Sequence, residues 1–258
     1  MVQISDCHLF ASVERRLLVL NTEDSLRQVV DLVAKEHPRV DVVIATGDLS
    51  QDGSTESYRR FQQHINRLNA PCFWLQGNHD IKAPMINVLG GQSCLSPCLI
   101  EQGDWRIIML NSSVEHEVPG YFQPSELVFL HDMLEKTRHH HTMICLHHHP
   151  LPMGCKWLDT QVVKNAADFW KIVDDFDHVR AIAWGHVHQE SDQMRHGVRL
   201  LSAPSTCVQF KPKSHDFAVD DIAPGYRWFD LYADGHIETQ VSRVKNIKFE
   251  VDHSIPGY

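Results

Sequence analysis

Short apolar runs rich in β-branched residues recur along the chain, and each predicts a buried strand. They occupy residues 2–5, 42–46, 72–75, 105–110, 142–146 and 179–184. Longer segments between these runs place apolar residues three or four positions apart, which is the spacing of one helix face. This spacing predicts helices around residues 25–34 and 58–68, a third that begins near Pro124, and a fourth over residues 162–173. Strands that alternate with helices predict a layered α/β architecture.

The C-terminal part of the chain has a different pattern. Residues 199–203, 226–232 and 236–244 are typical of consecutive antiparallel strands, and an Asp234-Gly235 turn joins the last two. We therefore expect a sandwich of two mixed β-sheets flanked by helices in a single domain, residues 1–258, with mainly antiparallel strands and a tail from about residue 199 to 258. The segment 211–224, rich in Lys, Pro and Asp, is expected to be a long surface loop.

Charge narrows the class of partner. The chain has 33 acidic and 24 basic residues and a net charge of -9. A surface of this sign repels nucleic acid and anionic membranes, so we expect neither as a partner. A small anionic substrate is compatible with it, because bound metal ions reverse the field locally. The sequence does not distinguish a monomer from a dimer.

The apolar and cysteine content bear on the compartment. The chain contains no run of about 18 apolar residues, and its N-terminus lacks the order of a signal peptide. The seven cysteines are an odd number and are scattered, which suits free thiols in the reducing cytoplasm. Cys94 and Cys98 are the closest two and are either ordinary loop residues or a redox or metal pair. Few residues precede Asp6, which leaves open whether some upstream residues are missing.

Polar residues follow five of the predicted strands at the point where each strand ends. They are Asp6 and His8, Asp48, Asn78 and His79, His147, and His186 and His188. Because the carboxyl ends of strands in an open α/β sheet share one crevice, five separate segments can deliver side chains to one place. Gly47, Gly77 and Gly185 directly precede three of the segments and permit the tight turns that this requires.

Carboxylate oxygens and imidazole nitrogens together suit iron, manganese or zinc, and the absence of a thiolate cluster argues against a closed structural zinc site. A carboxylate can bridge two cations and an imidazole cannot, so Asp48 is the candidate bridge. The remaining ligands then divide into two groups: Asp6, His8 and His188 for one ion, and Asn78, His147 and His186 for the other. Two ions about 3.5–4 Å apart can hold a hydroxide and clamp a phosphodiester.

Neighbouring residues have secondary roles in this hypothesis. His79 follows a candidate ligand and is placed to protonate a leaving oxygen, and Asp80 could orient His79 or a nearby ligand. The histidine run leaves the ligand as either His147 or His148, and the first residue after the strand is favoured. The side chain of Cys7 should point away from its two neighbours. The run 139–141 is expected to cap the preceding helix in solvent.

The ordered set D-x-H, G-D, G-N-H-[DE], H and G-H-x-H resembles the signature of the calcineurin-like metallophosphoesterase superfamily, and it runs from Asp6 to His188. Segments 146–152, 154–159 and 204–212 further resemble the bacterial class III 3′,5′-cyclic AMP phosphodiesterases. The resemblance implies two metal ions, usually iron with iron or manganese, with zinc as an alternative. It also implies that the nucleotide phosphate lies near one set of residues: His8, Asp48, Asn78, His79 and His188.

The resemblance implies hydrolysis of 3′,5′-cyclic AMP to 5′-AMP by a metal-bound hydroxide, which would lower the level of a second messenger. The alternative is a broader phosphodiesterase that acts on glycerophosphodiesters or 2′,3′-cyclic nucleotides. A regulatory protein that binds metal without turnover is disfavoured, because His79 and every ligand are present. Trp157, Phe210 and Tyr226 could stack on adenine, although such side chains more often belong to a core.

Overall fold

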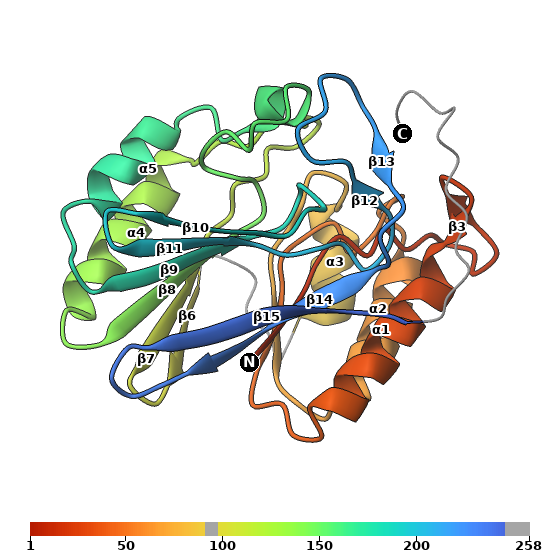
Figure 1. The fold of residues 1–258 in the computed structure, drawn as a ribbon, viewed down its shortest axis with the longest axis horizontal. Coiled ribbons are helices and arrows are strands. Elements are labelled where there is room, and N and C mark those ends of the chain that lie inside the picture. Colours follow the sequence, from red (N-terminus) through yellow and green to blue (C-terminus); the bar gives the residue numbers. More distant parts are fainter. Residues whose placement is uncertain (91–97, 246–258) are drawn as a thin grey trace.

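The computed structural model describes residues 1–90 and 98–245, which form two sheets packed between two layers of helices (Figure 1). The first sheet has the order β15-β14-β1-β4-β5. Its parallel centre consists of β1 (Val2–Ile4), β4 (Val43–Ala45) and β5 (Cys72–Trp74). The hairpin of β14 (Gly225–Leu231) and β15 (Ile237–Arg243) joins β1 antiparallel. The predicted C-terminal hairpin is therefore confirmed.

The second sheet has the order β10-β11-β9-β8-β7-β6. Four of its strands are parallel neighbours: β7 (Trp105–Met109), β8 (His141–Leu146), β9 (Val179–Trp184) and β11 (Val198–Ser202). The antiparallel strands β6 (Cys98–Gln102) and β10 (Ser191–Arg195) close its two edges. Two further two-stranded ribbons pair β2 (Arg16–Leu17) with β3 (Leu20–Asn21) and β12 (Gln209–Phe210) with β13 (Val219–Asp220).

Alternation along the strands explains the layers. In β4, Val43 and Ala45 face the apolar residues of α1 (Thr22–Glu36) and α2 (Thr55–Asn66), whereas Ile44 faces the second sheet. In β8, Ile144 packs toward α4 (Pro124–Lys136) and α5 (Ala166–Val173), and Met143 packs toward the first sheet. Because successive side chains of a strand point to opposite faces, one core forms between the sheets and one outside each sheet.

Sequence analysis placed two features wrongly. The segment 199–203 was expected in the C-terminal antiparallel run, but its strand β11 lies in the second sheet, parallel to β9 and antiparallel to β10. The fourth helix was expected from residue 162, but α5 begins at Ala166, after a short 3₁₀ turn at Leu158–Gln161. The segment 211–224 is a loop as expected, apart from the two residues of β13. Pattern analysis also missed α3 (Lys82–Leu89) and the edge strands β6 and β10. The one apolar residue of β10, Met194, is exposed, so this strand has no apolar pattern.

The remaining expectations concern the histidine run, the cysteines and helices that could span a membrane. His141 does not cap α4, because it begins β8, whereas His139 is exposed as expected. Cys7 and the other described cysteines are free thiols, and Cys94 lies outside the described residues, so its pairing with Cys98 does as well. Among residues 1–90 and 98–245, the helices are all too short or too polar to span a bilayer.

Candidate metal centre

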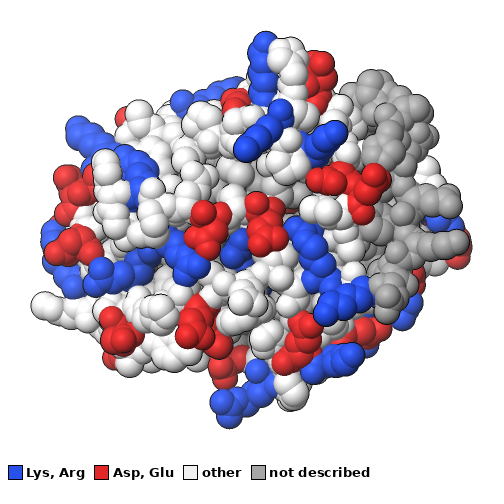
Figure 2. Space-filling model, in the orientation of Figure 1, with Lys and Arg blue, Asp and Glu red and all other residues white. Residues whose placement is uncertain are grey.

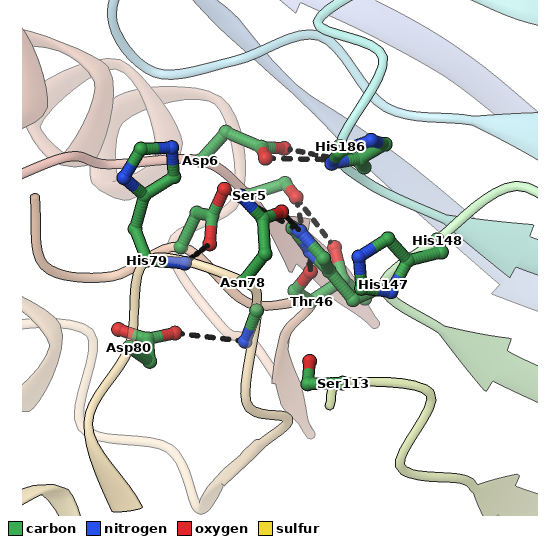
Figure 3. Close-up of polar contacts among 12 residues, drawn as sticks. Ser5, Asp6, Thr46, Asn78, His79, Asp80, Ser113, His147, His148 and His186 are labelled. Carbon is green, nitrogen blue, oxygen red and sulfur yellow. Dashed lines mark hydrogen bonds and ion pairs between the residues drawn. The ribbon is translucent and has the colours of Figure 1, made fainter. Parts of the chain in front are cut away.

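The polar residues that follow the parallel strands of both sheets meet in one place (Figure 3). Backbone hydrogen bonds between the loops hold them there: the N–H of Asp6 donates to the carbonyl of Gly47 at 3.0 Å, and the N–H of His8 donates to the carbonyl of Asp48 at 2.9 Å. In the second sheet, the N–H of Gly185 donates to the carbonyl of His147 at 3.2 Å. The structure therefore brings together the strand-end residues that the sequence singled out.

Asp48 lies at the middle of this group. One carboxylate oxygen, Oδ2, is 3.4 Å from Nε2 of His147 and 3.8 Å from Nε2 of His8. The other oxygen, Oδ1, accepts a hydrogen bond of 2.9 Å from the backbone N–H of His79. His147 Nε2 is also 3.1 Å from Oδ1 of Asn78. The carboxylate thus faces candidate ligand atoms from both sheets, which is the position that a bridging ligand requires.

Three histidines are held by their Nδ1 atoms and present Nε2 to the centre. Nδ1 of His147 contacts the carbonyl of Thr46 at 2.7 Å, and Nδ1 of His188 contacts the carbonyl of Val208 at 2.8 Å. His8 Nδ1 contacts the side-chain oxygen of Gln51. Because each oxygen can only accept, each Nδ1 carries a proton, and in the neutral ring Nε2 then has a lone pair for a cation. Sequence analysis missed all three oxygen partners, two of which are main-chain atoms.

The other half of the group involves Asp6 and His186. Both carboxylate oxygens of Asp6 accept from the backbone N–H of His186, at 3.0 and 3.1 Å, and Oδ1 is 3.5 Å from Nε2 of His188. His186 is buried, and its Nε2 has no hydrogen-bond partner among the described residues. A buried polar nitrogen without a partner is costly, so this atom suits a metal ligand.

Backbone conformation singles out the same residues. Five of the eleven described non-glycine residues with positive φ are Asp6, His8, Asp48, His186 and His188, with φ between 47° and 64°. This region costs an L-residue roughly 1–2 kcal/mol and is entered most readily by Asp, Asn and His. Such strain persists where the surroundings over-determine it and is concentrated at functional sites.

Close packing at two glycines of this site leaves no room for a side chain. A Cβ placed on Gly77 would lie 2.1 Å from Oδ1 of Asp48, and a Cβ on Gly185 would lie 2.1 Å from Oγ of Ser5. Both positions therefore require glycine, because the ligand loops approach each other within the width of a methyl group.

Asp80 joins the two loops that carry Asp48 and Asn78. Its carboxylate accepts hydrogen bonds from the backbone N–H groups of Gly77, Leu49 and Ser50 and from the hydroxyl of Tyr58. It therefore ties the loop after β4 to the loop after β5. Burial and the charge of Asp48 raise the pKa of Asp80, and these donors oppose the shift.

The geometry favours His147 over His148 as the candidate ligand. Both ring nitrogens of His148 are engaged: Nδ1 lies 2.8 Å from the hydroxyl of Ser112, and Nε2 lies 2.9 Å from the carbonyl of Val118. His147 turns its Nε2 toward Asp48 instead. Strand periodicity alone could not show this, because Ser112 and Val118 belong to another segment.

Burial and the neighbouring charges set the protonation of the centre. Burial lowers the pKa of His8 to about 3 against the opposing charge of Asp48, so the ring is neutral. Burial alone would raise the pKa of Asp48, but His147, His79 and His8 hold it well below its usual range. The Nε2 atoms of His8 and His188 are 3.1 Å apart. Two lone pairs at this distance repel unless a cation or proton lies between them.

His79, Cys207 and Cys7 differ in how close they lie to the candidate ligands. The ring of His79, which is partly exposed, lies 5.0 Å from that of His8. Cys207, which sequence analysis did not assign to the site, has its sulfur within 4.8 Å of ligating atoms of His8 and His188. Cys7 packs into the core under α1 and α2, as expected.

Of the three aromatic residues considered for adenine, Tyr226 is far from this role. It is buried in the core beneath α1, and its hydroxyl donates to Glu36 at 2.7 Å. Phe210 is buried and stacks on the ring of His188, with centroids 4.1 Å apart and planes at 6°. Trp157 is half-buried beside Phe210.

The fold and this set of oxygen and nitrogen ligands define a metal-dependent phosphoesterase. Comparison with known families agrees: residues 1–190 match the family described as Calcineurin-like phosphoesterase, and the chain belongs to it. The family uses a dinuclear metal centre, and His and Asp groups able to bind metal are present here.

Proteins of similar sequence include named cyclic AMP phosphodiesterases. The chain is 43% identical over 258 residues to the 3′,5′-cyclic adenosine monophosphate phosphodiesterase CpdA of Pseudomonas aeruginosa, covering 100% of this chain and 94% of the relative. It is 44% identical over 259 residues to the protein of the same name from Vibrio vulnificus, with the same coverage. Among solved structures, a dimetal phosphatase from Danio rerio has a TM-score of 0.65 at 15% identity, covering 95% of this chain and 98% of the other, which shows the shared fold.

Proposed function

We propose that the protein hydrolyses 3′,5′-cyclic AMP to 5′-AMP, using a pair of metal ions held between the two sheets. The observation that carries the proposal is the convergence of carboxylate, amide and imidazole ligands around Asp48. Full-length relatives named as cyclic AMP phosphodiesterases support the substrate. The net charge of -9 agrees with a small substrate rather than a nucleic acid.

The ligands present fit two cations. Asp6, His8 and His188 would hold one ion and Asn78, His147 and His186 the other, with Asp48 shared. The orphaned Nε2 of His186 and the facing Nε2 atoms of His8 and His188 support this division. Mixed oxygen and nitrogen ligands favour iron with iron or manganese, and zinc remains compatible.

When bound, the two cations supply an activated water near neutral pH and Lewis-acid stabilisation of charge on the phosphoryl oxygens. The residues of the chain orient the substrate and supply the proton. Asp48 fixes the backbone of His79, so the imidazole is held at the rim of the centre beside His8. From there His79 can donate a proton to the ribose 3′ oxygen as its bond to phosphorus breaks. Asn78 can donate its amide N–H to a phosphoryl oxygen.

The test is a chromatographic assay of 5′-AMP release from cyclic AMP. The protein would be stripped with a chelator and reloaded in parallel with iron, manganese or zinc. Asp48→Asn is expected to abolish turnover and lower the amount of bound metal, whereas the matched variant Asp52→Asn should retain both. Reloaded protein that leaves cyclic AMP intact while cleaving 2′,3′-cyclic AMP or glycerophosphodiesters would contradict the proposed substrate.

A further inference from the structure

Three aromatic rings extend from the metal centre toward the surface. Phe210, on β12, stacks on His188. Trp157 lies against Phe210 with ring centroids 4.9 Å apart, and Phe217 lies 5.1 Å from Trp157 and 5.7 Å from Phe210. Phe210 is buried, whereas Trp157 and Phe217 are half-buried. We call Trp157, Phe210 and Phe217 the aromatic wall.

The outer part of the wall is fixed in place. The indole N–H of Trp157 donates to the hydroxyl of Ser214 at 3.2 Å, and the backbone N–H of Lys156 donates to the carbonyl of Ser214 at 3.0 Å. The sulfur of Cys155 also lies 3.3 Å from the same hydroxyl. The segment before the 3₁₀ turn is thereby joined to the β12–β13 ribbon. A ring held in this way loses little further freedom when a ligand stacks on it.

Exposed side chains of both charges lie on the segments that form the outer part of the wall, and Asp216 and Asp221 are the acidic ones. Lys156, Lys211 and Lys213 are exposed on the two segments that form it, although the chain as a whole has a net charge of -9. Nζ of Lys156 lies 2.8 Å from Nε2 of His215. Figure 2 shows several blue side chains at the upper end of the molecule, where β13 lies in Figure 1, beside red ones.

We propose that the aromatic wall is the base-binding subsite of the enzyme, with Trp157 as the residue that stacks on the purine. This inference rests on the proposed function. In a cyclic nucleotide, one ribose separates the phosphate from the base. In the protein, one ring, that of Phe210, separates Trp157 from the ligand His188. A phosphate at the centre can therefore extend its base toward the half-buried rings. Phe210 acts as a positioning residue, because it is covered by His188 and Trp157.

The experiment compares cyclic AMP with ribose 3′,5′-cyclic phosphate, which keeps the reacting diester and lacks the base. Trp157→Leu keeps an apolar side chain and removes the stacking surface. Stacking of a base on an aromatic side chain changes binding by roughly 10- to 100-fold. We expect Trp157→Leu to raise KM for cyclic AMP by about that factor with kcat unchanged, and to leave both constants for the baseless substrate unchanged. Trp157→Phe should recover part of the loss.

Two further variants keep the test decisive. Phe217→Leu is expected to raise KM for cyclic AMP by a smaller factor, and it decides the question if Trp157→Leu fails to fold. Trp228→Leu, a half-buried tryptophan on β14 beside His37, is the matched control and should change neither substrate.

Either of two results would overturn the inference: Trp157→Leu affecting both substrates by the same factor, or Trp157→Leu matching Trp228→Leu. Wild-type protein that cleaves bis(p-nitrophenyl) phosphate and not cyclic AMP would overturn the proposed function itself, and this inference with it.

Discussion

Asp80→Asn tests whether the metal centre depends on the junction between its loops. The two carboxylate oxygens of Asp80 accept four hydrogen bonds: Oδ2 from the backbone N–H groups of Gly77 at 2.9 Å and Leu49 at 3.3 Å, and Oδ1 from the N–H of Ser50 at 3.0 Å and the hydroxyl of Tyr58 at 3.1 Å. Asparagine replaces one of these oxygens with an NH₂ group. In either orientation, two donors then face a donor.

The expected loss of stability follows from the number of donors left without an acceptor. A buried donor without an acceptor costs about 1–3 kcal/mol, so two of them cost about 2–6 kcal/mol, less whatever the hydroxyl of Tyr58 recovers by rotating. In a chain of this length, 1 kcal/mol lowers Tm by roughly 2–4 °C, so a cost of about 3 kcal/mol lowers Tm by roughly 6–12 °C. Because loss of an outer partner typically weakens metal binding about 10- to 100-fold, metal affinity should fall by that factor as well.

Thermal unfolding of metal-free protein, followed by circular dichroism, measures the first effect, and calorimetric titration with manganese measures the second. Asp52→Asn is the matched control: its carboxylate, in the same loop, accepts backbone N–H bonds from Ala11 and Ser54 rather than from the loop after β5. We expect it to lower Tm slightly and to leave metal affinity unchanged. If Asp80→Asn behaved like Asp52→Asn in both measurements, the junction would not support the centre.

Three other changes have defined outcomes. His79→Ala should retain its metals, by elemental analysis, while kcat for cyclic AMP falls by about 10²- to 10⁴-fold, the range for an acid–base group; loss of metal would instead make it a ligand. Gly77→Ala should lose metal binding, because the added Cβ would lie 2.1 Å from the central carboxylate, and normal metal content would refute the packing described here. Glu23→Gln should lower the free energy of unfolding by about 0.5–1 kcal/mol, because Glu23 bonds Arg60 and His64 on α2. Although burial opposes it, these partners lower the pKa of Glu23, so the stabilisation is present above the unfolded pKa near 4.3 and disappears as pH falls through the folded pKa. Urea titrations of both proteins at several pH values check this, and a difference that persists at low pH would contradict it.

The sequence by itself determined the parts of this protein that depend on local pattern. Apolar runs located nine strands of the two sheets, because strands buried between layers are apolar along their length. Period-3.6 spacing located the main helices, because each buries one face. The ordered D-x-H to G-H-x-H pattern located the carboxylate, amide and imidazole groups near Asp48, because parallel strands of a sheet end at the same edge. It did not locate Cys207. The edge strand β10 was missed because its residues are nearly all polar.

Only the tertiary structure decided which strands pair and which side chains are hydrogen-bonded to each other. It placed β11 parallel to β9, and the local sequence of neither strand predicts this pairing. It assigned His148 to Ser112 and left His147 facing the centre. It also brought Asp80 into contact with the backbone of both ligand-bearing loops. The physical reason is common to all three: hydrogen bonds and strand pairing join atoms that are distant along the chain, whereas sequence periodicity reports only the local conformation and the face that is buried.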